Sequence, residues 1–225
     1  MSEPQRFVAV ATGLAFEARL ARGDETRVCC GHGQRLSEAL RAAAGPGCAG
    51  IVSFGIAGGL DPRLGVGAAV IASSVIGADA AYPTDARWAQ RLLQAAPGAE
   101  HGSLYAADQP VLDPAAKAAL HRRSGAAAAD MESHVAAAIA AEKKIPFAVL
   151  RVVADPANRR VPDAALAGMR DDGTLDALAV LRALMRQPAA LAPLMRVARD
   201  TSIARKVLAD LFHRLGPGFG LLDLG

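Results

Sequence analysis

Two carboxylates, Glu132 and Asp155, stand where two predicted strands end. The small apolar run 126–129 predicts the first strand, and the β-branched run Phe147–Val153 predicts the second. A pair of carboxyl groups can divide two tasks, because a protonated one donates a proton and an ionised one stabilises positive charge. Taken singly, Glu132 could merely cap a helix and Asp155 could merely start a turn.

The residues between these carboxylates predict how they are positioned. Ser133–Lys143 is rich in alanine and predicts a helix, so the stretch 126–155 is predicted as strand, turn, helix and strand. A strand–helix–strand crossover is right-handed and brings both strands into one parallel sheet. We therefore expect Glu132 and Asp155 near the same sheet edge, where ligands bind in open α/β sheets.

Upstream, two more strands lead to residues of interest. The run Phe7–Thr12 predicts a buried strand, and Glu17 lies in the first turn of the helix that follows, where the helix dipole favours a negative charge. The run Gly50–Phe54 predicts a strand that enters a glycine-rich turn at 55–59, whose backbone N–H groups could approach a ligand. His32 lies in a predicted loop and could reach an anion in the site.

The remaining elements follow from apolar periodicity and turn residues. Further strands are predicted at 26–30, 68–75 and 101–105, and further helices at 34–44, 85–94, 114–123, 166–186 and 191–215.

Length and composition limit the function classes. With 225 residues and 52% hydrophobic content, the chain is expected to form one domain, 1–225, whose part from about 166–225 is basic, leucine-rich and helical. Aromatic content of 4% is too low for a platform that stacks on nucleic acid. Three cysteines without a CxxC pair and scattered histidines predict no metal and no disulfide framework.

The start of the chain lacks the apolar segment of a secretory signal, and no run reaches the roughly 18 apolar residues of a transmembrane helix. We expect a cytoplasmic protein. The basic amphipathic C-terminal part would also suit peripheral contact with the inner membrane face.

Four short pieces occur in a fixed order: GLAFE at 13–17, GIAGG at 55–59, DME at 130–132 and RVVAD at 151–155. This ordered set resembles the nucleoside phosphorylase and nucleosidase superfamily from residue 7 to about residue 158. The resemblance implies an α/β fold, a three-layer α/β/α sandwich with a central mixed, largely parallel sheet. It also implies an enzyme that cleaves the N-glycosidic bond of a purine nucleoside, and a homo-oligomer.

The resemblance assigns roles to residues that match its motifs. Asp155 would protonate the purine N7 as the bond breaks, Glu17 would position or activate the nucleophile, and Glu132 would accept hydrogen bonds from the ribose hydroxyls. The other residues assigned to substrate binding are Met131, Ala57, Gly58, Gly59 and Gln109.

The nucleophile is left open between water and phosphate, and no other cofactor is implied. Phosphorylases of this superfamily usually carry an arginine just before the glycine turn, where this chain has only Val52, Ser53 and Phe54. The chain also departs from the nucleosidase pattern at Ile56 and Ala154. Arg151 lies inside a strand, where its side chain could point away from the site.

A narrower resemblance concerns GLAFEAR at 13–19, DMES at 130–133 and the arginine-rich C-terminal part, which look like the hopanoid-associated phosphorylase-like proteins. It implies release of adenine from adenosylhopane, a lipid-linked purine nucleoside. Two alternatives remain: a nucleosidase for methylthioadenosine or S-adenosylhomocysteine, which needs a compact pocket for the 5′ group, and a non-catalytic binder of purine nucleosides.

Overall fold

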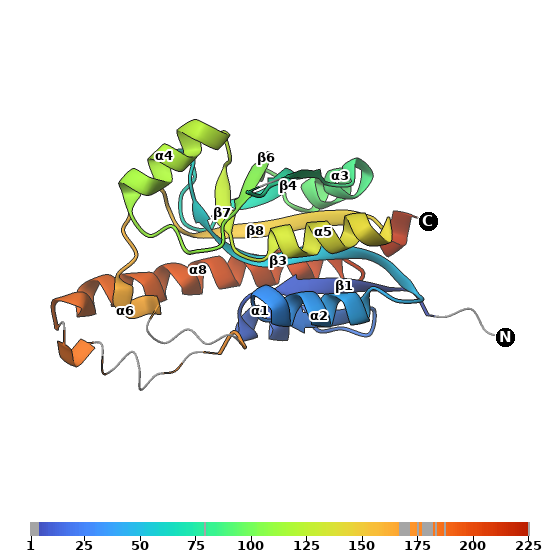
Figure 1. The fold of residues 1–225 in the computed structure, drawn as a ribbon, viewed down its shortest axis with the longest axis horizontal. Coiled ribbons are helices and arrows are strands. Elements are labelled where there is room, and N and C mark those ends of the chain that lie inside the picture. The colour runs from blue at the N-terminus through green and yellow to red at the C-terminus, as the bar shows by residue number, and fades with distance from the viewer. Residues whose placement is uncertain are drawn as a thin grey trace.

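A computed structural model describes residues 5–78, 80–166 and 188–224, and between the last two ranges residues 172–174, 176, 182 and 184–186. Strands and helices alternate over most of the chain (Figure 1). The first elements are β1 (Phe7–Thr12), α1 (Ala15–Leu20), β2 (Thr26–Cys30), α2 (Gly33–Ala43), β3 (Cys48–Gly59), β4 (Ala69–Ile76), β5 (Ala81–Pro83) and α3 (Ala86–Ala95). The later ones are β6 (Glu100–Ala106), α4 (Pro114–Ser124), β7 (Ala128–Asp130), α5 (Ser133–Lys143), β8 (Phe147–Asp155), α6 (Asp163–Leu166) and α8 (Leu191–Leu215), with short 3-10 turns at Pro188–Ala190 and Leu222–Leu224.

The long strand β3 joins two parts of the sheet. Its first half pairs in parallel with β1, which in turn pairs with β2. Its last two residues, Gly58 and Gly59, pair antiparallel with β7 on that side, while β8 runs parallel to β3 along the other. The strand β8 then pairs antiparallel with β4, and β4 and β6 and then β6 and β7 pair in parallel.

These pairings close β3, β8, β4, β6 and β7 into a ring, so the sheet is a barrel with β1 and β2 extending from one side. The expected α/β fold with a central mixed sheet is confirmed. The expected three-layer sandwich is not confirmed. Such a sandwich has an open sheet, in which β7 would lack its antiparallel contact to β3. That contact exists because β3 continues past the point at which β1 ends.

Two hydrophobic clusters pack helices against the sheet. Leu36 and Leu40 of α2 lie with Ile139 of α5 in one cluster, and Trp88 of α3 lies with Leu208 of α8 in the other. Full burial of each such side chain is worth about 1.5–3 kcal/mol. The helix α8 is therefore part of the core (Figure 1).

The periodic pattern located most elements well. The strands Phe7–Thr12 and Thr26–Cys30 and the helices Ser133–Lys143 and Leu191–Leu215 are confirmed at the expected bounds. The predicted helix at 166–186 lies largely outside the described residues. Within the described part of the chain, no helix is both long and apolar enough to span a membrane.

The expectation of a glycine-rich turn at 55–59 is wrong. These residues form the second half of β3 and keep strand pairing up to Gly59. Small apolar runs with glycine usually indicate a turn, but here the barrel supplies neighbours on both edges of β3.

Candidate active site

The strand register brings the two predicted carboxylates together. Gly58 of β3 is aligned with Ala129 of β7 on one side and with Asp155 of β8 on the other. The end of β7, which leads to Glu132, and the end of β8 therefore lie on either side of one glycine. The expectation of two parallel strands is wrong, because β7 runs against β3 and β8 runs with it. The strand ends still meet, because β7 is only three residues long.

A cavity of about 590 Å³ opens at this place. Of the eight residues predicted from the sequence, seven line it: Glu17, Asp155, Glu132, Met131, Gly58, Ala57 and Gln109. Gly59 does not, since the space beside its Cα is occupied by Val153 and Pro156. The residues are in place, while their chemical roles stay predictions.

Glu17 connects the turn after β1 to β3. Its Oε2 accepts hydrogen bonds from the backbone N–H groups of Gly13 (3.0 Å) and Leu14 (2.9 Å), and its Oε1 accepts one from Ile56 (2.8 Å). Glu17 is only 1% exposed. Burial raises the pKa of Glu17 to about 7, although the charge of Arg151 opposes that shift. A carboxyl group that titrates near neutral pH suits a general base.

Glycines let the carboxylates approach the backbone closely. A Cβ on Gly13 would lie 2.5 Å from Oε1 of Glu132, and a Cβ on Gly55 would lie 2.6 Å from Nη1 of Arg151 and also collide with Glu17. The glycines of the predicted turn therefore make room for charged side chains from other elements.

Arg151 is a residue whose importance the sequence reasoning missed. It lies fully buried in β8, and its Nη2 donates to Oγ of Ser53 at 2.6 Å. The same nitrogen lies 2.6 Å from Oδ2 of Asp130 and 3.3 Å from Oε2 of Glu132. Its side chain thus points into the carboxylate cluster, although it does not line the cavity. The signal was an arginine within an otherwise apolar strand, because a buried charge requires a partner.

The charges around Glu132 favour its ionised form. Burial alone would raise its pKa, but the hydrogen bond from His32 and the charge of Arg151 outweigh burial and lower the pKa of Glu132. His32 Nδ1 donates to Oε1 of Glu132 at 2.8 Å, so the anion that His32 reaches is this carboxylate. Burial raises the pKa of Asp130, which also accepts a hydrogen bond from the Ser133 hydroxyl.

Asp155 has the opposite tendency. Its side chain is 26% exposed and lines the cavity, and burial raises its pKa although the ammonium of Lys117 opposes the shift. Lys117 Nζ lies 2.5 Å from Oδ2 of Asp155. Lys117 was also missed, because a lysine in a predicted helix normally faces solvent.

The site thus holds one carboxyl group whose pKa is lowered, that of Glu132, and three whose pKa values are raised, those of Glu17, Asp130 and Asp155, on the walls of one cavity. This combination can support positive charge on a bound group and can give and take protons. Within the part of the chain that the structure describes, no group of three or more His, Cys, Asp or Glu residues could hold a metal ion.

Comparison with known proteins assigns the family. The model of the phosphorylase superfamily matches residues 6–187, and the chain belongs to that superfamily. No curated protein sequence matched the chain.

Solved structures show the same fold at low sequence identity. A variant of 5′-methylthioadenosine/S-adenosyl homocysteine nucleosidase from Helicobacter pylori, with 5′-methylthioadenosine in its active site, has a TM-score of 0.63 at 12% identity, over 93% of this chain and 99% of that one. Futalosine hydrolase of the same organism has a TM-score of 0.65 at 14% identity, over 92% and 97%. S-adenosylhomocysteine nucleosidase from Streptococcus pyogenes, in complex with 5-methylthiotubericidin, has a TM-score of 0.64 at 14% identity, over 96% and 100%.

Proposed function

We propose that this protein cleaves the N-glycosidic bond of a purine nucleoside and releases the free base. The observation that carries the proposal is that Glu132 and Asp155 line one cavity with opposite pKa shifts, at the ends of strands β7 and β8, which pair on either side of Gly58. Membership of the phosphorylase superfamily and the nucleosidases of like fold support it.

In the proposed reaction the three carboxyl groups have separate tasks. The ionised Glu132 binds the ribose hydroxyls and stabilises the positive charge that develops on the sugar. Asp155 gives its proton to the purine as the bond between the sugar C1′ and the base breaks, so the base leaves as a neutral molecule. Glu17 accepts a proton from the attacking nucleophile.

We propose water as that nucleophile. The guanidinium of Arg151 is already matched by the carboxylates of Asp130 and Glu132, and Arg151 does not line the cavity. A phosphate beside Glu17 would therefore gain nothing from Arg151 and would be repelled by the ionised carboxylate, since two unit charges 4 Å apart interact by about 4 kcal/mol at an effective dielectric constant of 20. Water carries no such penalty.

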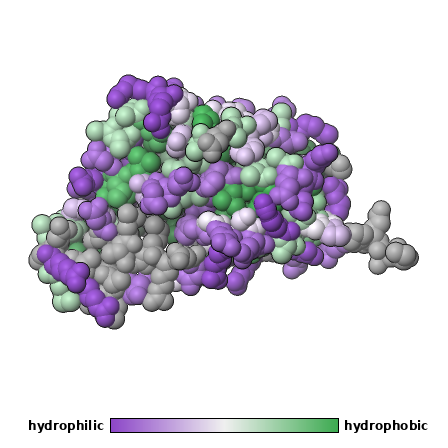
Figure 2. Space-filling view, viewed as in Figure 1, coloured by the Kyte–Doolittle hydropathy of each residue, from purple (hydrophilic) through white to green (hydrophobic). Residues whose placement is uncertain are grey.

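The walls of the cavity support a substrate with an apolar 5′ group. Phe16 of α1 and Val197 of α8 line it together with Leu112 and Val161 from the loops. Hydrophobic surface is visible between α4 and the N-terminal half of α8 (Figure 2). Adenosylhopane is our candidate substrate, because its 5′ side is a bulky hydrocarbon. The second candidate is 5′-methylthioadenosine, which is bound in a solved structure of like fold.

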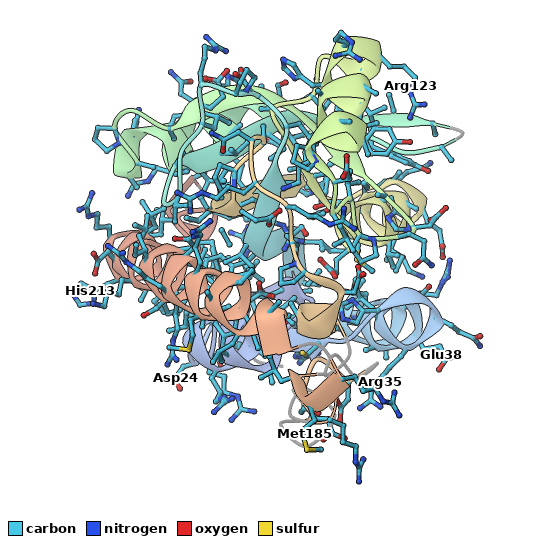
Figure 3. The ribbon with its side chains drawn as sticks, turned by 90° about the vertical axis from the view of Figure 1, so that its left-hand side faces the viewer. Asp24, Arg35, Glu38, Arg123, Met185 and His213 are labelled. Carbon is cyan, nitrogen blue, oxygen red and sulfur yellow. The ribbon has the colours of Figure 1, made fainter. Side chains whose placement is uncertain are left out.

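A lipid-linked substrate would fit peripheral contact with a membrane. Large apolar side chains are exposed on α8 and just before it, at Leu191, Met195 and Met185, and Met185 points away from the body of the molecule (Figure 3). Arginines at 186, 196 and 199 accompany them and would favour an anionic surface. We also propose a homo-oligomer and a cytoplasmic location.

The test is the release of adenine, followed by chromatography. The protein is incubated with adenosylhopane or with 5′-methylthioadenosine, in buffer with and without phosphate. We expect adenine without phosphate, faster from adenosylhopane, and ¹⁸O from labelled water in the released sugar. Phosphate-dependent release would overturn the hydrolytic proposal, and binding without release would leave a purine nucleoside binder.

A further inference from the structure

Lys117 occupies a position that the stability of its own helix does not explain. It lies in the first turn of α4, close to the positive end of the helix dipole, where a cation is unfavourable. The helix already has Asp113 as its N-cap, which accepts from the N–H of Ala115, and Pro114 at its first position. Yet the Lys117 side chain is 0% exposed, although lysine is rarely buried without a partner.

Among the described residues, the ammonium of Lys117 is held by the segment that ends β8 and follows it. Nζ donates to Oδ2 of Asp155 at 2.5 Å and to the carbonyl oxygens of Asp155 (3.4 Å), Pro156 (3.2 Å) and Arg159 (3.2 Å). The contact with Oδ2 fixes the direction of the Asp155 side chain. Asp155 and Lys117 both line the cavity. They also place a full positive charge against that carboxyl group.

We propose that Lys117 is a positioning residue, which aims the Asp155 carboxyl group at the substrate and controls through its charge when that group carries a proton. The proposal rests on the proposed function, in which Asp155 is the acid. Without Lys117, the carboxyl group would be free to rotate and would lose its nearest cation.

The neighbouring charges decide the sign of the effect. Burial raises the pKa of Asp155, the ammonium of Lys117 lowers it, and Asp200 of α8 raises it further. Arg159 is paired with Asp200. Removal of the ammonium takes away the largest influence that lowers this pKa and leaves only a backbone hydrogen bond to oppose burial and Asp200, so the pKa of Asp155 should rise. Because a general acid works while protonated, the loss of activity at high pH should then move to higher pH.

The variants Lys117→Gln and Lys117→Met remove the charge, and glutamine retains a donor for the carbonyl oxygens. Lys143→Gln is the matched control, since Lys143 lies at the exposed end of α5 and forms an ion pair with the exposed Glu142. The titration of Asp155 is followed by ¹³C NMR of its carboxyl carbon, assigned with Asp155→Asn, and kcat and KM are measured against pH.

We expect the pKa of Asp155 to rise by roughly 1–3 units in both Lys117 variants, which is the range for loss of an adjacent opposite charge. We expect kcat to fall by about 10²-fold from misplacement of the acid, with a smaller change in KM. The control should match the wild type. An unchanged or lower pKa of Asp155 in a folded Lys117 variant overturns the proposal.

Two features keep the test decisive. The carboxyl titration needs no substrate, so it is independent of whether the wild-type protein releases purine. If neither variant folds, ¹⁵N NMR of the Lys117 ammonium in the wild-type protein replaces them: the Nζ resonance should shift as Asp155 titrates, and a resonance that stays constant through that titration overturns the proposal.

Discussion

Replacement of Arg151 by methionine should destabilise the protein, and the loss should depend on pH. Arg151 is fully buried, and its guanidinium contacts Asp130 at 2.6 Å and Glu132 at 3.3 Å. Removing one partner of a buried ion pair costs about 3–5 kcal/mol, because the remaining charges stay uncompensated. For a chain of this size 1 kcal/mol corresponds to about 2–4 °C, so we expect the melting temperature to fall by roughly 6–20 °C near pH 8.

The sign of the pH dependence follows from the two carboxylates. Burial already raises the pKa of Asp130, and without the guanidinium it rises further, while the pKa of Glu132 also rises. Both folded-state pKa values then lie above the unfolded values of about 3.9 and 4.3. The folded variant then holds protons that the unfolded chain has released, so its stability falls as pH rises. The difference from the wild type should therefore be largest near pH 8 and shrink toward pH 5.

Thermal unfolding followed by circular dichroism from pH 5 to pH 8 measures this difference. Arg41→Met is the control, since Arg41 forms an ion pair with Glu142 at 3.0 Å but its side chain is 48% exposed. Exposed pairs contribute about 0–1 kcal/mol, so this variant should melt within a few degrees of the wild type at each pH. Two results would refute the reasoning. The first is an Arg151→Met variant that melts like the control, and the second is a loss of stability that is the same at pH 5 and pH 8.

Three further predictions concern the site. In the proposed reaction Glu17 acts as a base while ionised, and burial raises its pKa to about 7, so wild-type kcat/KM should rise with pH through about 7. Glu17→Gln should lower kcat by about 10²–10⁴-fold and remove that limb of the pH profile. Gly13→Ala places a Cβ 2.5 Å from Oε1 of Glu132, so KM should increase, whereas Gly65→Ala, with open space around its Cα, should leave KM unchanged. His32→Ala removes the hydrogen bond that lowers the pKa of Glu132, so this pKa should rise. When the pH is lowered, the affinity for a purine nucleoside analogue, measured by calorimetry, should therefore begin to fall at a higher pH in this variant than in the wild type.

The sequence was sufficient for elements whose pattern is local. The apolar run of β1 and the alanine-rich helix α5 are encoded by adjacent residues, and both were located at their bounds. The approach of Glu132 to Asp155 was also predicted, since each carboxylate stands at a strand end. The predicted reason was wrong: the strands are not parallel neighbours but meet on either side of Gly58.

The rest depended on long-range packing. Gly55 resembles a turn residue locally, but it lies in β3, and a glycine is needed there because Glu17 and Arg151 fill the space that a side chain would take. The contact between Lys117 and Asp155 joins residues 38 positions apart through the register of β8 and the placement of α4. No pattern within a short window carries that information.

The most direct test of the account compares purine release and ligand affinity in Asp155→Asn. Asparagine keeps the size of the side chain but has no acidic proton, so we predict that kcat for adenine release falls by about 10²–10⁴-fold, while the Kd for a non-hydrolysable purine nucleoside analogue stays within a few-fold of the wild type. Purine release at the wild-type rate by this variant would contradict the account.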